Sequence, residues 1–143
     1  MRNSFVADST LIQALERLAV SVPCVKGHQL FKQGEVPIGL YLLKSGKASL
    51  VMTAEDGEEV LHLTVGPGSI LGVPAVVGRD FYTLSAFARP GAEVGFVTQK
   101  EFEDLIQAEP SLFPRVLEVL AAEVRSARLA LSGLLRKLSK QQA

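Results

Sequence analysis

The chain has 143 residues, the size of one ordinary domain, and its 15 basic and 15 acidic side chains give a formal net charge of zero. A zero net charge gives no long-range attraction for nucleic acids or anionic membranes, and a single cysteine, Cys24, excludes an internal disulfide. The polar start and the lack of any apolar run of about 20 residues predict a cytoplasmic protein with no membrane span.

A short amphipathic helix is predicted first, over residues 9–21. Apolar side chains repeat at helical spacing from Leu11 onward, and Thr10 and Gln13 have the spacing of a capping box. Pro23 then ends the helical pattern. We expect this helix to pack against the element that follows it.

Residues 22–97 have the pattern of an antiparallel β-sandwich or β-barrel. Short runs of Val, Leu, Ile, Tyr and Phe are separated by glycine turns, such as those at Gly46 and Gly57, with no long helical insert. The pattern predicts a mainly β fold with flanking helices, and of the two arrangements we favour the barrel, a double-stranded β-helix of the jelly-roll kind. Alternation in the run 59–65 places His62 on the less apolar face of its strand.

Two helices are predicted after the barrel, over residues 98–109 and 111–139. Thr98 and Glu101 form a second capping box at the start of the first of them. The longer helix carries apolar residues three and four apart, the spacing of a seam between two helices. These residues are Leu117, Leu120, Val124, Ala127, Leu131, Leu134 and Leu138.

The apolar stripe of the long helix has two interpretations. A helix that packs on its own barrel shows the same spacing. We favour the seam, and hence a homodimer, because about 25 residues of helix extend about 37 Å, more than a barrel this small can cover. Only residues 139–143 follow the stripe, too few for a DNA-reading helix, so we expect no nucleic-acid binding by this chain alone.

Four local segments, at 27–35, 40–46, 66–72 and 85–94, resemble the cyclic-nucleotide-binding domain family in their order and spacing. The order of helix, barrel, short helix and long helix is also similar to that family. The resemblance covers roughly residues 10–138 and implies a single domain over residues 1–143. It also implies that residues 66–83 form a phosphate-binding cassette.

The cassette departs from the family's pattern at both of its polar anchors. The family uses a Glu after the glycine for the ribose and an Arg for the phosphate, but Val73 follows Gly72 here and Tyr82 stands at the Arg position. Without the carboxylate and the guanidinium, two hydrogen bonds to charged groups are lost. This loss removes on the order of 4–6 kcal/mol of binding free energy, or about three to four powers of ten in affinity. Either these residues fill an old pocket, or they line a pocket for a different small effector. The candidate ligand-binding residues are Gly72, Val73, Pro74, Ala75, Arg79, Tyr82 and Thr83.

Other chemistry has little support in the sequence. Arg79 and Arg89 flank the cassette and are the candidates to replace the missing Arg, although Arg79 also fits a solvated loop residue beside Asp80. His28 and His62 lack the third partner that a metal site requires, and no catalytic triad, carboxylate pair or phosphate-binding loop with its Lys is present. We therefore expect no enzyme, no catalytic or metal-binding residue and no certain cofactor.

Two functions remain open at this point. The first is a regulatory module that senses a small effector, a cyclic nucleotide or another molecule, and signals through the long helix. The second is a ligand-free module that uses the same fold to dimerise or to bind a protein partner.

Overall fold

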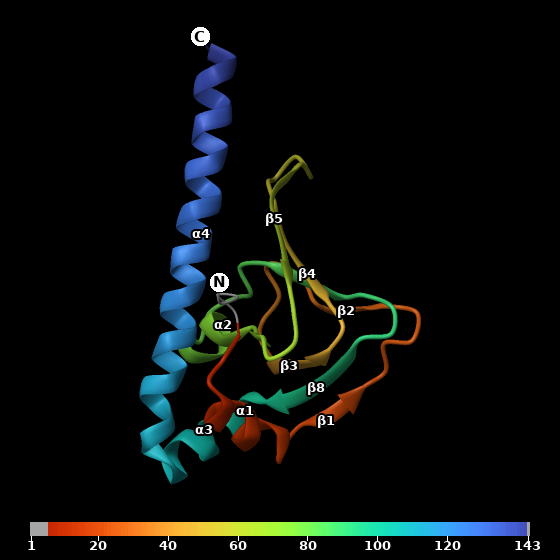
Figure 1. Cartoon of the computed structure of the whole chain (residues 1–143), viewed down its shortest axis with the longest axis vertical. Coiled ribbons are helices and arrows are strands. Elements are labelled where there is room, and N and C mark those ends of the chain that lie inside the picture. Colours follow the sequence, from red (N-terminus) through yellow and green to blue (C-terminus); the bar gives the residue numbers. More distant parts are fainter. Residues whose placement is uncertain (1–5, 143) are drawn as a thin grey trace.

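The computed structural model describes residues 6–142, except for the side chains of residues 127, 130, 131, 134, 135 and 137–142 in the last helix. Helices and strands appear in the order expected for a barrel with flanking helices (Figure 1). The elements are α1 (Ser9–Glu16), β1 (Val20–Val22), β2 (His28–Phe31), β3 (Gly39–Ser45), β4 (Ala48–Thr53), β5 (Glu59–Val65), β6 (Ile70–Leu71), α2 (Val73–Gly78), β7 (Ser85–Ala88), β8 (Glu93–Thr98), α3 (Gln99–Ala108), the 3-10 turn η1 (Pro110–Leu112) and α4 (Phe113–Gln142).

The strands form two four-stranded sheets whose pairings are all antiparallel. The first sheet has the order β1-β8-β3-β6 and the second has the order β2-β7-β4-β5. Alternate residues of the strands point inward, so that Leu43, Leu50, Ala86 and Val94 are buried in one cluster between the sheets. The expectation of a mainly β, jelly-roll-like fold with flanking helices is confirmed.

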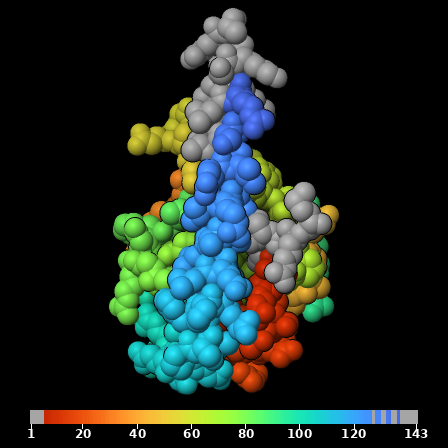
Figure 2. All heavy atoms as spheres, turned by 60° about the vertical axis from the view of Figure 1, so that its left-hand side comes forward, coloured from red at the N-terminus to blue at the C-terminus, as the bar shows by residue number. Residues whose placement is uncertain are grey.

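A second apolar cluster joins the helices to the outer side of the first sheet. It contains Leu15 of α1, Val73 of α2, Phe102 of α3 and Val116 of α4, packed against Leu40 of β3. The last helix lies on the surface, with α2 on one side and α1 on the other, and then continues past the barrel (Figures 1 and 2). The start of α4 is therefore fixed to the barrel by burial, and its later turns extend beyond it.

The N-terminal helix begins at Ser9 as predicted, but its N-cap residue and its end differ from the prediction. Asp8, and not Thr10, is the N-cap, and its carboxylate accepts a hydrogen bond from the Thr10 N–H at 2.8 Å. The helix ends at Glu16, and Val20–Val22 forms an edge strand paired with β8. Two β-branched residues beside the free edge of β8 favour strand pairing over a continued helix.

The capping box predicted at Thr98 and Glu101, at the start of α3, is confirmed. The Thr98 hydroxyl accepts a hydrogen bond from the Glu101 N–H at 3.1 Å, and the Glu101 carboxylate accepts one from the Thr98 N–H at 3.1 Å. Two backbone donors at the start of α3 are thereby satisfied, which fixes the point where β8 turns into helix.

Candidate functional site

The turn between β6 and α2 forms the start of the candidate cassette. Gly72 has φ of +92°, a left-handed conformation that glycine adopts without strain, and it caps α2. A Cβ atom at this position would lie 3.1 Å from the ring of Tyr82. Pro74 stands in the first turn of α2, where its missing N–H would have had no helical partner. The turn is thus built for close contact between its backbone and the Tyr82 ring.

Tyr82 occupies the centre of the cassette and is held there on three sides. Its ring stacks on Phe31 with 4.0 Å between ring centroids, and its hydroxyl donates a hydrogen bond of 2.6 Å to the Gly39 carbonyl oxygen. Its backbone N–H donates to the Glu35 carbonyl, and its own carbonyl accepts from Gly34. Only 4% of Tyr82 is exposed, and burial raises the pKa of its phenol.

The space left beside Tyr82 is small. The cavity beside it, which we call the cassette cavity, has a volume of about 20 Å³, which is room for about one water molecule. It is lined by Phe31, Leu50, Leu71, Gly72, Pro74, Ala75, Tyr82, Thr83, Leu84 and Glu123. Four of the predicted ligand-binding residues, Gly72, Pro74, Ala75 and Thr83, therefore meet around the ring of a fifth, Tyr82.

The contribution of the Tyr82 hydroxyl can be measured. Tyr82→Phe is expected to lower the free energy of unfolding by about 1 kcal/mol, the usual net value of one buried hydrogen bond. Tyr41→Phe is the matched control, because Tyr41 is also a largely buried tyrosine of the same core, but its hydroxyl makes no hydrogen bond to another side chain or to the backbone in the described part of the chain. Urea unfolding of both variants tests this, and an equal loss in the two would contradict it.

Two predicted residues lie away from the cassette cavity. The Val73 side chain is 2% exposed and packs in the second apolar cluster with α1 and α3. Arg79 has a left-handed backbone, is largely exposed and forms an ion pair with Glu103 of α3, with 3.1 Å between nitrogen and oxygen. Neither side chain lines the cavity.

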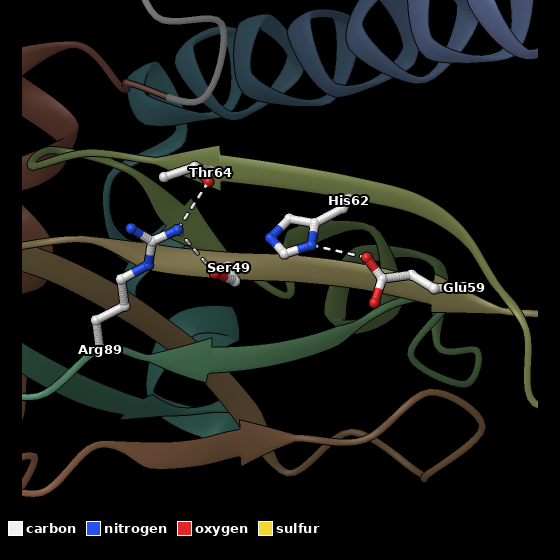
Figure 3. Close-up of polar contacts among 5 residues, drawn as sticks. All are labelled: Ser49, Glu59, His62, Thr64 and Arg89. Atoms are coloured by element: carbon white, nitrogen blue, oxygen red, sulfur yellow. Dashed lines mark hydrogen bonds and ion pairs between the residues drawn. The ribbon is translucent and has the colours of Figure 1, made fainter.

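Arg89 points in a different direction from the cassette. Its guanidinium donates to the Thr64 hydroxyl at 3.1 Å and to the Ser49 hydroxyl at 3.4 Å, across β4 and β5 (Figure 3). His62 is exposed on β5 and lies 2.7 Å from the Glu59 carboxylate, which confirms its expected place on the less apolar face (Figure 3). Among the residues that the structure describes, no arginine, lysine or histidine lines the cassette cavity.

Glu123 of α4 lines the same cavity, although it was not among the residues predicted from the sequence. Glu123 is partly buried, and desolvation among apolar neighbours raises the pKa of its carboxyl to about 8. It also lines a second, larger space of about 250 Å³ between α4 and the β4–β5 hairpin, which we call the α4 groove. The one available signal was a carboxylate directly beside Val124, inside an otherwise apolar stripe.

The described part of α4 carries two apolar faces. Val116, Val119 and Ala122 are buried against the rest of the molecule, although none was a predicted seam residue. Leu117 is 47% exposed and Val124 is 61% exposed. Leu120 is partly buried, and the side chains of Ala127, Leu131, Leu134 and Leu138 lie outside the described residues. The fully buried positions of α4 are therefore not the predicted seam positions, although Leu120 of the seam packs against the same cluster as Val116 and Val119.

The described residues contain neither a metal-binding cluster nor a membrane-spanning helix. Within residues 6–142, no three His, Cys, Asp or Glu side chains gather where they would hold a metal ion. The helices of this same stretch include none with the length and hydropathy for crossing a membrane.

Comparison with known proteins gives a consistent result. A family model described as the cyclic nucleotide-binding domain matches residues 22–109, well over half of the chain. The chain is 29% identical over 106 residues to the cyclic AMP receptor protein of Thermus thermophilus, covering 74% of this chain and 49% of that protein. It is 27% identical over 128 residues to a CRP-like cAMP-activated global transcriptional regulator of Mycobacterium tuberculosis, covering 90% of this chain and 57% of that one.

The structural comparison agrees with the sequence matches. The crystal structure of the Thermus thermophilus catabolite activator protein superposes with a TM-score of 0.74 at 26% identity, over 89% of this chain and 60% of that chain. The chain spans about half the length of the curated relatives named above.

Proposed function

Since the chain belongs to the cyclic nucleotide-binding domain family, we propose that it is a regulatory sensor module whose effector is not a cyclic nucleotide held in the family's usual way. The observation that carries this proposal is the position of Tyr82, whose ring and hydroxyl occupy the centre of the cassette. A phosphate there would meet a phenol ring in place of a guanidinium.

The charges around the cassette support the same proposal. A cyclic phosphate needs donors and a countercharge, which helix N-terminal N–H groups and an Arg provide in such sites. Arg79 and Arg89 have partners elsewhere. Glu123 does line the cavity, and its carboxylate would repel an anion when ionised. The Gly72 turn is retained, but the polar groups that would hold a nucleotide are not.

The signal in this proposal passes through α4. Glu123 and Leu120 of α4 line the α4 groove together with Thr83 and Pro74 of the cassette, so that an occupant of the groove contacts both elements. The exposed Leu117 and Val124 support a homodimer formed along α4, in which movement of the helix reaches a second copy. The module needs no catalytic group for this role.

We expect cyclic AMP and cyclic GMP to bind weakly or not at all. Isothermal calorimetry with the whole chain tests this directly. Tyr82→Arg should raise the affinity for cyclic AMP about tenfold or more, because one hydrogen bond to a charged group contributes roughly 1.5–3 kcal/mol. Arg89→Gln is the control and should leave nucleotide binding unchanged, since Arg89 contacts Ser49 and Thr64 on another face.

Low-micromolar binding of either nucleotide by the unchanged chain would contradict the proposal.

The test changes Tyr82 alone and leaves Val73 in place. Val73 is buried among the helices, and a Glu placed there would be desolvated without a partner.

A ligand-free module is the second candidate, and the nearly filled cassette cavity favours it. Thermal shift with a panel of small molecules separates the two candidates. A ligand at 100 times its dissociation constant adds about 2.7 kcal/mol of stability, whereas a ligand-free module shows no response to any compound.

A further inference from the structure

The α4 groove has the size and lining of a site for a small molecule. Its volume of about 250 Å³ falls just below the range of about 300–1,000 Å³ that drug-sized ligands occupy. Met52, Leu61, Leu63 and Leu84 provide apolar walls from the barrel. Among the described side chains that line it, only those of Thr83 and Glu123 are polar. A ligand with a mainly apolar body and one polar end matches this lining.

The carboxyl of Glu123 has no partner in the groove. No hydrogen bond or ion pair is recorded for it among the described residues, and no titratable group from α2, β4 or β5 lines the groove beside it. The nearest arginine in sequence, Arg125, is exposed. A carboxyl in apolar surroundings without a countercharge is costly when ionised, so a bound countercharge would relieve that cost.

We propose that the α4 groove binds a small organic cation, with its apolar body against the β4–β5 hairpin and its ammonium group on the Glu123 carboxylate. This inference rests on the proposed function, in which the protein does not hold its effector through a phosphate group of that effector. An ammonium group supplies three hydrogen-bond donors and a positive charge, and the attraction is stronger in apolar surroundings than in water. A neutral ligand of the same shape gains only the apolar contact, and an anion is repelled.

Binding of a cation has a proton signature that simple apolar binding lacks. Burial raises the pKa of Glu123 to about 8, so that near neutral pH the carboxyl is mostly protonated. It must ionise to pair with an ammonium, and one proton then passes from the carboxyl to solvent for each ligand bound. Affinity should therefore rise with pH, by up to about tenfold per unit below the pKa of the carboxyl.

Calorimetry with matched probes tests the proposal on the whole chain. Phenethylamine, phenethyl alcohol and hydrocinnamate share one shape but carry a positive, zero and negative charge, and hexylamine with hexanol repeats the comparison in another shape. We expect each amine to bind at least tenfold more tightly than its alcohol, and hydrocinnamate to bind least. Buffers of different ionisation heat should report release of about one proton per amine near neutral pH.

Two variants assign the effect to the groove. Glu123→Gln keeps the size of the side chain and should remove both the amine preference and the proton release, with little change for the alcohols. Glu118→Gln removes an exposed carboxylate of the same helix and should change neither. Circular dichroism of both variants checks that they fold.

Three outcomes would overturn the inference. They are equal binding of amines and alcohols, an amine preference retained by Glu123→Gln, and binding seen only in a monomeric variant, which would mean that a second copy covers the groove. Tight cyclic AMP binding would instead defeat the proposed function. Weak nucleotide binding without amine preference would defeat this inference alone.

Discussion

Glu123→Gln is expected to be more stable than the unchanged protein at and above about pH 8, by on the order of 2–4 kcal/mol, since each pKa unit corresponds to about 1.4 kcal/mol. The reason is the desolvation of the carboxyl, which burial among apolar groups holds in its protonated form up to a pKa of about 8. We take less than the full value because Glu123 is only partly buried.

The direction of the pH dependence follows from proton binding. Between the ordinary pKa of 4.5 and the folded value of about 8, the folded chain binds more protons at Glu123 than the unfolded chain does. Stability from this group therefore falls as pH rises through that window, and below it the group has no effect because both states are protonated. The two proteins should differ least near pH 4 and most above about pH 8.

Urea unfolding at several pH values measures this difference at a fixed protein concentration, because dimer formation also changes apparent stability. Glu118→Gln, which removes an exposed carboxylate of α4, should follow the unchanged protein at every pH. If Glu123→Gln also runs parallel to the unchanged protein from pH 5 to about pH 8.5, the carboxyl is not desolvated as the structure indicates.

The barrel was predictable because its information is local. Glycines such as Gly46 and Gly57 have positive φ at the turns where the sequence places them, and alternating apolar residues between them face the core. The capping box at Thr98 is equally local and was found for the same reason. Patterns of this kind depend on residues a few positions apart, so they can be recognised in the sequence without knowledge of the tertiary structure.

The residues that the sequence missed depend on long-range contacts. The strand β1 exists because β8 offers it an edge, and nothing near Val20 in the chain indicates that partner. Glu123 reaches the cassette because α4 packs across α2, a contact between segments about 50 residues apart. Val73 was predicted at the cassette from its place after Gly72, but the direction of its side chain follows from the orientation of α2 in the second cluster.

The long helix was predictable in its apolar spacing but not in which of its faces packs on the barrel. Its apolar spacing was visible, and the structure adds that the residues buried against the barrel are Val116 and Val119, each one position before a predicted seam residue. Of those two seam residues, Leu117 is exposed and Leu120 is partly buried against the same cluster. A helix with one buried stripe and a second exposed stripe has apolar surface left for a partner. The exposed Val124 lies on that second stripe.

Leu131→Glu is expected to convert the protein from a dimer to a monomer. In a parallel pair of helices each seam residue meets its counterpart, so two glutamates would be desolvated against each other at the centre of the seam. Light scattering at tens of micromolar protein measures the mass of both proteins.

Leu129→Glu is the matched control, because it adds the same charge to the same part of α4 at a side chain that is 73% exposed. Leu129 lies two residues from Leu131, on the opposite side of the heptad from the seam, so its variant should remain a dimer. A monomeric unchanged protein, or a dimeric Leu131→Glu, would refute the seam. In that case the exposed side chains of Leu117 and Val124 would need another partner, and a signal from the α4 groove would have no second copy to reach.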